Sequence, residues 1–175
     1  MTLLRSMAIA VMLVAAIASA KEIPDVAVVD QSGRPLHFYR DLIAQKVVVV
    51  AFFFTQCQGT CSIVAYTLDH LQTALGDRLG RDVSLISVSI DPKHDTPAAL
   101  AEWGKRHRVK PGWTLVTGDQ DAMNRLSRAF TSDNARPGLH SIIVYIGNDR
   151  TGEWIRDTGS AKTEHYLEVL ARMSK

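Results

Sequence analysis

The sequence contains only two cysteines, Cys57 and Cys61, among its 175 residues. The chain can therefore hold no more than one internal disulfide, which excludes the disulfide-rich class of small secreted domains. The formal net charge of +2 is too small to suggest binding to nucleic acid. A glycine-rich phosphate-binding loop, an internal repeat and a low-complexity segment are all lacking. The length suits one domain, so its chemistry is expected to depend on one pair of thiols.

The first twenty residues have the composition of a secretory signal peptide. A basic residue precedes an apolar run over residues 7–17, and the small residues at 18–20 supply a cleavage motif. This apolar run is too short for a membrane-spanning helix. We therefore expect cleavage after Ala20, a periplasmic domain formed by residues 21–175, and no membrane span in the mature chain. An uncleaved N-terminal anchor is the alternative.

The stretch from residue 47 to residue 75 joins a buried strand to a helix through the two cysteines. Val47–Phe53 is β-branched first and then aromatic, which is typical of a strand buried on both faces. Beyond the cysteines, apolar residues recur at roughly helical spacing, at Ile63, Tyr66, Leu68, Leu71 and Leu75. We expect Thr55 or Thr60 to cap this helix, whose dipole would favour the thiolate form of the cysteines.

The rest of the chain alternates predicted strands and helices. A hairpin is expected over residues 25–40, and the sequence Asp95-Thr96-Pro97 predicts a helix start. The predicted elements after the hairpin lie at 47–53, 62–75, 83–90, 98–107, 113–116, 120–130, 141–146, 153–156 and 163–173. This order predicts an α/β fold with a mainly parallel central sheet and helices on both faces. Cysteines at the end of the first long strand fit a thioredoxin-like architecture.

The spacing of the cysteines favours chemistry over structural cross-linking. A Cys57–Cys61 bridge closes only a small loop, so it stabilises a fold less than a bridge across a long loop. Thiolates combined with an imidazole select copper or zinc, and His140 is the candidate imidazole if the loop before the strand at 141–146 reaches the sulfurs. Three ligands are too few for a closed structural zinc site, but they suit Cu(I), or Cu(II) with an added oxygen ligand. The other histidines are expected to be solvated: His37, His70, His94, His107 and His165.

Three segments resemble the landmark segments of the Sco/SenC family. These are FFFTQCQGTC at residues 52–61, ISVSIDPKHDTPAAL at 86–100 and LHSIIVYI at 139–146. The resemblance implies a thioredoxin-like fold and a role in cytochrome c oxidase assembly. It matches Cys57 and Cys61 to the copper-binding cysteine pair, and His140 to the third ligand.

The chain departs from the usual family pattern around these ligands. Gln58 and Ser62 follow the cysteines where the family usually has proline, and the segment between the cysteines lacks an acidic residue. Leu139 stands where an aspartate ordinarily precedes the histidine. These changes remove negative charge near the metal and an orienting partner for the imidazole.

The resemblance implies a monomeric periplasmic copper metallochaperone of the Sco/SenC type. Its partner would be the oxidase subunit that carries the binuclear copper centre, or another periplasmic copper or thiol protein. The residues also permit a thiol–disulfide oxidoreductase, in which Cys57 attacks a substrate disulfide and Cys61 resolves the mixed disulfide. A third alternative is a thiol peroxidase, in which Cys57 is oxidised to a sulfenic acid and Cys61 condenses with it.

Overall fold

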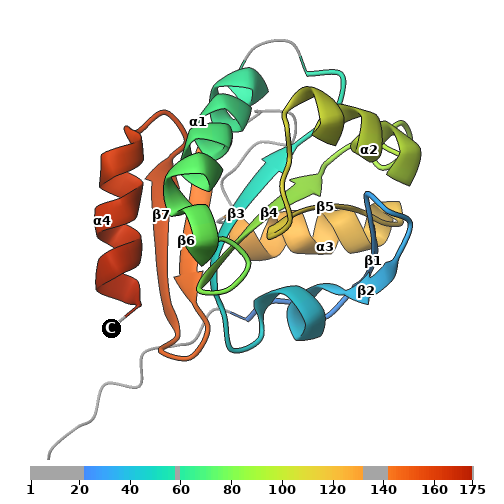
Figure 1. Cartoon of the computed structure of the whole chain (residues 1–175). Helices are drawn as coiled ribbons and strands as arrows, with labels where there is room; N and C mark the ends of the chain where they lie inside the picture. The colour runs from blue at the N-terminus through green and yellow to red at the C-terminus, as the bar shows by residue number, and fades with distance from the viewer. Residues whose placement is uncertain (1–21, 58–59, 132–141, 175) are drawn as a thin grey trace, which may run out of the picture.

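One seven-stranded sheet with the strand order β2-β1-β5-β4-β3-β6-β7 organises the molecule (Figure 1). The structure is a computed structural model that describes residues 22–57, 60–131 and 142–174. Its strands are β1 (Ala27–Asp30), β2 (Pro35–His37), β3 (Val47–Phe53), β4 (Val83–Ser89), β5 (Trp113–Thr117), β6 (Ile143–Asn148) and β7 (Glu153–Thr158). Its helices are η1 (Phe38–Ile43), α1 (Thr60–Leu75), η2 (Gly76–Arg78), α2 (Pro97–Arg106), α3 (Gln120–Phe130) and α4 (Thr163–Met173).

The predicted order of strands and helices is confirmed, from the hairpin to the last helix. One turn of π-helix, η1, was not predicted. The predicted helix start at Asp95-Thr96-Pro97 is also confirmed, because the Thr96 side chain caps α2 by accepting a hydrogen bond from the Ala99 main-chain nitrogen. Local signals such as caps and apolar periodicity therefore identified every long element correctly.

The prediction of a mainly parallel sheet was wrong in its strand directions. Only β3, β4 and β5 run parallel, and the other four of the six strand pairs are antiparallel. Parallel neighbours need a crossover, which α1 and α2 supply for these three strands. The hairpin joins the same sheet by pairing β1 with β5, and β6 enters antiparallel to β3. Alternation of strands and helices does not specify those directions.

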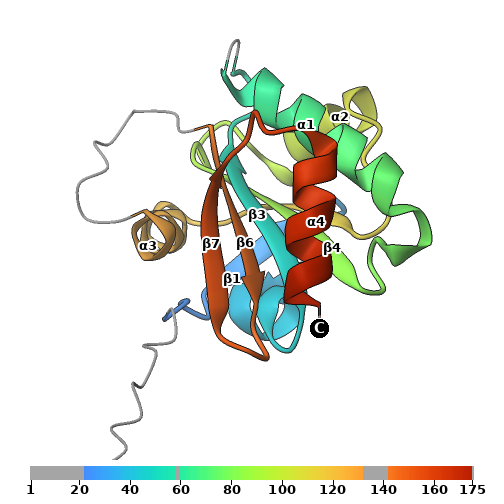
Figure 2. The same ribbon diagram turned by 90° about the vertical axis from the view of Figure 1, so that its left-hand side faces the viewer.

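Two apolar layers cover the two faces of the sheet, as the sequence predicts. Figure 2 shows α1, α2 and α4 on one face and α3 on the other. Successive side chains of a strand point to opposite faces, so β3 contributes to both layers. Val49, Ala51 and Phe53 pack in the layer under α1, whereas Val48 and Val50 pack in the layer under α3. This double burial explains the continuous apolar run of the sequence.

The edge strand β2 is closed to further pairing. Pro35 has no N–H group, and the main-chain nitrogen of His37 donates a hydrogen bond to the Asp41 carboxylate at 2.6 Å. Asp41 belongs to η1, so this short helical turn protects the edge. Within the described ranges, none of the helices has the length and apolar character needed to cross a bilayer.

The three parallel strands give the molecule two distinct ends. We call the end where β3, β4 and β5 finish the carboxyl edge, and the end where they begin the amino edge. Figure 1 shows β3 directed toward the β3–α1 connection, whereas α4 finishes at the other end of the sheet. The Asn148 side chain fixes that helix end by donating to the Met173 main-chain oxygen at 2.7 Å. The cysteines therefore lie at the carboxyl edge and the end of α4 at the amino edge.

Candidate functional site

The β3–α1 connection carries the cysteines where the sequence predicts them, between a buried strand and a helix start. Cys57 follows the end of β3, and Cys61 belongs to the first turn of α1. Cys57 is half-buried and disulfide-bonded, and its main-chain nitrogen donates to the Phe54 main-chain oxygen at 3.2 Å. The side chain of Cys61, the only other cysteine of the sequence, lies outside the described residues.

The predicted third ligand, His140, also lies outside the described residues. The strand that follows it is described, and its direction matters for the site. β6 pairs antiparallel with β3, with Val144 opposite Ala51 and Asn148 opposite Val47. The beginning of β6 therefore lies at the carboxyl edge, where β3 ends. A parallel β6 would have begun at the amino edge instead.

Gly159 joins the beginning of β6 to the first turns of α1. Its main-chain nitrogen donates to the Ile142 oxygen, and its own oxygen accepts from the Thr67 hydroxyl at 2.7 Å. A Cβ atom at this position would lie 2.6 Å from Val64 Cγ2 and 2.7 Å from the Ile142 oxygen. Only glycine allows this close approach of the three segments. The start of β6 is thus held against the helix that begins at the cysteines.

The buried side chain of Asp95 organises the β3–α1 connection. This carboxylate is 0% exposed and accepts hydrogen bonds from the Thr55 hydroxyl at 2.5 Å and the Ser89 hydroxyl at 2.6 Å. The Thr55 main-chain nitrogen also donates to both carboxylate oxygens, at 3.1 and 3.2 Å. Asp95 thereby fixes the segment leading to Cys57 onto the end of β4.

Sequence reasoning missed this role of Asp95, which it interpreted only as part of a helix start. The Thr55 hydroxyl points to Asp95, so Thr55 is not the cap of α1. The side chain of Thr60, the other predicted cap, lies outside the described residues. No local signal identifies the contact, because Thr55 and Asp95 are 40 positions apart. The useful indication was that Thr96 already supplies a cap, which leaves the Asp95 side chain available for another partner.

Asp91 and His94 form a polar turn directly after β4. The Asp91 main-chain oxygen accepts from the nitrogens of His94 and Asp95, so Asp91 and Pro92 begin a turn. His94 Nδ1 lies 2.8 Å from the Asp91 carboxylate, and the imidazole is exposed. His94 therefore places an exposed imidazole at the carboxyl edge.

The expectation that every other histidine is solvated was wrong for His107. The four remaining side chains are exposed as expected: His37, His70, His94 and His165. The His107 ring is half-buried and stacks on Trp103, with ring centroids 3.9 Å apart. Burial lowers the pKa of His107, and the neighbouring charge of Arg106 lowers it further.

Two members of the predicted apolar stripe of α1 do not face the core. Ile63 is 45% exposed and Tyr66 is 64% exposed. The buried face of α1 is formed instead by Val64, Ala65, Leu68, Leu71 and Leu75. The helical period was therefore predicted correctly, but two large apolar side chains beside the cysteines remain on the surface.

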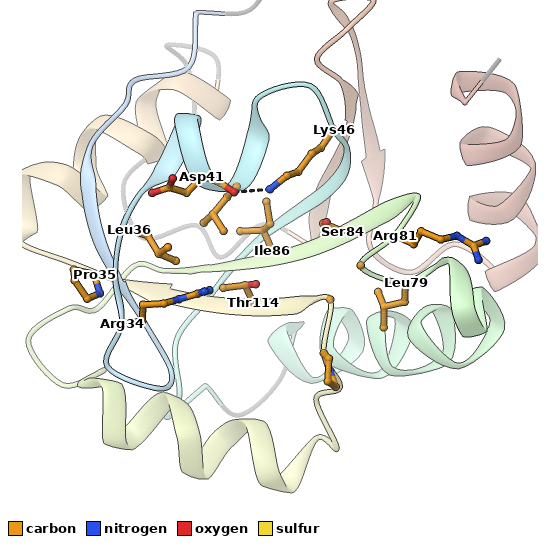
Figure 3. A pocket seen from close by; sticks show the side chains of 14 residues that line it. Arg34, Pro35, Leu36, Asp41, Lys46, Leu79, Arg81, Ser84, Ile86 and Thr114 are labelled. Atoms are coloured by element: carbon orange, nitrogen blue, oxygen red, sulfur yellow. Dashed lines mark hydrogen bonds between the residues drawn. The ribbon is translucent and has the colours of Figure 1, made fainter.

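One large hollow of the described surface lies away from the cysteines. It measures about 1000 Å³ and lies at the amino edge, where Leu36 and Ile86 lie between the side chains of Arg34 and Lys46 (Figure 3). A smaller hollow of about 670 Å³ lies at the carboxyl edge and includes Asp95 and Thr117. The chemistry of the thiols, not cavity size, places the candidate site at the β3–α1 connection.

Metal-binding groups are sparse in the part of the chain that the structure describes. Among these residues, no three histidine, cysteine, aspartate or glutamate side chains gather in a metal-binding arrangement. Of the predicted ligand set, only the Cys57 side chain belongs to that part. The ligand prediction for Cys57, Cys61 and His140 therefore stays a prediction.

Comparisons with known proteins agree with one another. The model of a protein family described as SCO1/SenC matches residues 16–151 of this chain. A SCO2-like protein of Rickettsia conorii is 27% identical over 112 residues, which cover 64% of this chain and 52% of that protein. The chain thus spans about half the length of this curated relative.

Solved structures show the same fold. A SCO1/SenC family lipoprotein from Bacillus anthracis has a TM-score of 0.76 and 22% identity, covering 90% of this chain and 97% of that one. The structure of Bradyrhizobium japonicum ScoI with copper bound has a TM-score of 0.68 and 20% identity, covering 84% and 96%. The thioredoxin-like fold predicted from the sequence is confirmed by this likeness.

Proposed function

Because the chain belongs to the SCO1/SenC family, we propose that it is a copper metallochaperone whose cargo is bound by Cys57, Cys61 and His140. Two thiolates and one imidazole form a soft donor set that suits copper. The sulfurs bind metal only as thiolates, so the disulfide-bonded state of Cys57 is the metal-free form of this site. Reduction of the pair would then precede loading with copper.

The observation that carries this proposal is the antiparallel pairing of β6 with β3. It brings Ile142 to the carboxyl edge, where Gly159 holds it against α1. His140 precedes Ile142 by two residues, and two residues of extended chain span at most ~7 Å. This short reach supports convergence of the imidazole with the cysteine pair. The copper-bound ScoI structure of the same fold supports copper as the cargo.

We further propose that the mature protein acts in the periplasm. The support is the signal-like composition of residues 1–20, which ends in a small-residue cleavage motif. The proposed partner is the cytochrome c oxidase subunit that carries the binuclear copper centre, or another periplasmic copper or thiol protein. Its support is family membership alone.

The direct test is Cu(I) titration of reduced protein against a competing chelator. We expect Cys57→Ser and Cys61→Ser to abolish tight binding, because each removes a thiolate ligand. His140→Ala is expected to lower affinity by at least about tenfold, the scale on which loss of a ligand or its support affects metal sites. His94→Ala is the matched control, since it removes an exposed imidazole from the same edge. Unchanged affinity in His140→Ala and Cys57→Ser would refute the copper site.

A thiol–disulfide oxidoreductase is the second candidate, and the disulfide at Cys57 favours it. In this reaction the Cys57 thiolate attacks a substrate disulfide and expels one substrate thiolate. Cys61 then attacks Cys57, which releases the second substrate thiol and leaves the protein oxidised. Trapping of a mixed disulfide by Cys61→Ser, together with undetectable copper binding by the reduced protein with both cysteines present, would favour this candidate over the first.

A further inference from the structure

The exposed side of α1 carries an unusual pair of apolar side chains. Ile63 and Tyr66 are the only large hydrophobic residues that are exposed in the described parts of the chain. They follow Cys61 by two and five positions, and residues three apart lie on the same side of a helix. Exposed apolar side chains that gather beside a reactive site indicate contact with a partner.

This apolar pair continues into a polar hollow further along α1. The Tyr66 ring lies against the His70 ring, with centroids 4.0 Å apart. His70 in turn lines a hollow of about 500 Å³ together with Asp69, Arg108 and Lys110. A continuous surface therefore runs from the cysteine end of α1 to the segment that follows α2.

The last turn of α2 and the segment after it are strongly basic. Residues 105–110 read KRHRVK, with four cations in six positions. Arg108 pairs with Asp69 at 2.5 Å and Lys105 with Glu102 at 2.7 Å. Arg106 and Lys110 make no ion pair with any residue that the structure describes. Their charges are therefore available to an external group.

Gln72 fixes the basic segment against α1. Its side chain donates to the Arg108 main-chain oxygen at 3.0 Å and accepts from the Lys110 nitrogen at 3.0 Å. Gln72 is 1% exposed, so this clamp is part of the folded core. The main chain at Arg108 and Lys110 is thus held at a fixed position relative to the cysteine helix.

We propose that Ile63, Tyr66, His70 and the cations of residues 105–110 form a docking surface for an acidic protein that reacts at Cys57. This inference rests on the proposed function, because the partner is the protein that exchanges copper or a disulfide with the cysteine pair. Complementary charge would raise the rate of encounter, and the apolar pair would be covered next to the reacting sulfur. The helix rises about 1.5 Å per residue, so Asp69 lies ~12 Å beyond Cys61.

Synthetic peptides with one cysteine activated as a 2-pyridyl disulfide provide a defined probe. The Cys57 thiolate forms a disulfide with the peptide sulfur, and pyridine-2-thione leaves with the bonding electrons, so no other oxidant is needed. The reaction is followed by thione absorbance in the reduced Cys61→Ser protein, where the product cannot be resolved. A spacer of about four extended residues, ~13 Å long, separates the peptide cysteine from a run of either aspartates or lysines.

We expect the aspartate peptide to react about tenfold faster than the lysine peptide at low ionic strength, with the difference shrinking in high salt. The double variant Arg106→Glu/Lys110→Glu should abolish or reverse this preference. The matched control is Lys46→Glu/Arg150→Glu, which makes the same charge change in a hollow at the amino edge. A preference that is absent, or that both variants lose equally, would overturn the proposal.

The apolar half of the surface is tested with a leucine or a serine in the spacer. With the Cys61→Ser protein, we expect the leucine peptide to react severalfold faster than the serine peptide, because burial of apolar surface favours the encounter. When Tyr66→Ser is added to that protein, the two peptides should react equally fast. Equal rates for the two peptides with the Cys61→Ser protein would show that Tyr66 is not part of the docking surface. Failure of Cu(I) binding would not alter these rates, so the copper proposal and the docking proposal can fail separately.

Discussion

The carboxylate of Asp95 accepts hydrogen bonds from both the main-chain nitrogen and the hydroxyl of Thr55, 40 positions earlier in the chain. Thr55 lies two residues before Cys57, so this buried contact determines how the β3–α1 connection leaves the sheet. The same carboxylate binds Ser89 at the end of β4. One side chain therefore links the cysteine segment to two other elements of the fold.

Replacing Asp95 with asparagine should destabilise the protein. The amide nitrogen of asparagine is a donor, and it would face the donors that now bind the carboxylate. We expect the free energy of unfolding to fall by about 1–3 kcal/mol, the usual cost of an unsatisfied buried group. Urea unfolding measures this change. Asp121→Asn, at an exposed position in the first turn of α3, should cost less than about 1 kcal/mol. Equal losses in the two variants would contradict the role given to Asp95.

Gly159→Ala should disturb the packing between α1 and the start of β6. The added methyl would lie 2.6 Å from Val64 Cγ2, which is inside van der Waals contact. We expect a loss of about 1–3 kcal/mol of unfolding free energy, as for other overpacked sites. Val64→Ala removes the clashing methyl, so the double variant should lose less than the sum of the two single losses. Strict additivity would show that the close approach is not the cause.

The pH dependence of stability should contain a contribution from His107. Because burial lowers its pKa in the folded protein, the unfolded chain binds more protons at mildly acidic pH. Neutral His107 therefore contributes its full stability at pH values above its ordinary pKa of about 6.5. This contribution is lost as the pH falls through the lowered pKa that His107 has in the folded protein. His107→Gln should therefore flatten the decrease in unfolding free energy between about pH 7 and pH 5. An identical slope in the parent protein and the variant would refute this prediction.

Thr117→Val should stabilise the protein. The Thr117 side chain is 5% exposed, and its hydroxyl has no hydrogen-bond partner among the described residues. Valine has nearly the same shape and removes the unsatisfied group, which we expect to raise the unfolding free energy by about 1 kcal/mol. Thermal and urea unfolding both report the change. For comparison, Ser87→Ala should destabilise, because it leaves the buried Trp113 indole N–H without its present acceptor. A lower stability in Thr117→Val would show that its hydroxyl is in fact satisfied.

Much of the fold follows from local sequence, because apolar period and capping residues act within a few positions. Val47–Phe53, Gln120–Phe130 and Thr163–Met173 were predicted with the bounds that the structure has. Strand direction was predicted wrongly, since the antiparallel pairing of β6 with β3 depends on contacts between distant residues. The same limit hid the link between Asp95 and Thr55.

The surface of α1 shows a different limit of sequence reasoning. Helical spacing grouped Ile63 and Tyr66 with Leu68, yet the structure leaves the first two exposed. Periodicity identifies apolar positions but does not show whether a neighbouring element covers them. A deviation of this kind beside the cysteines is informative, because it leaves apolar surface for the docking partner that we propose.

The end of α4 at the amino edge has a practical consequence for biosensor and pull-down work. Asn148 fixes Met173 there, and Ser174 lines a hollow at that edge, on the side of the molecule remote from the sulfurs. A fluorophore, affinity tag or chip linker attached after this helix would leave the reactive end pointing into solution. Attachment through engineered cysteines on α1 would have the opposite effect and would block the approach of a visiting protein.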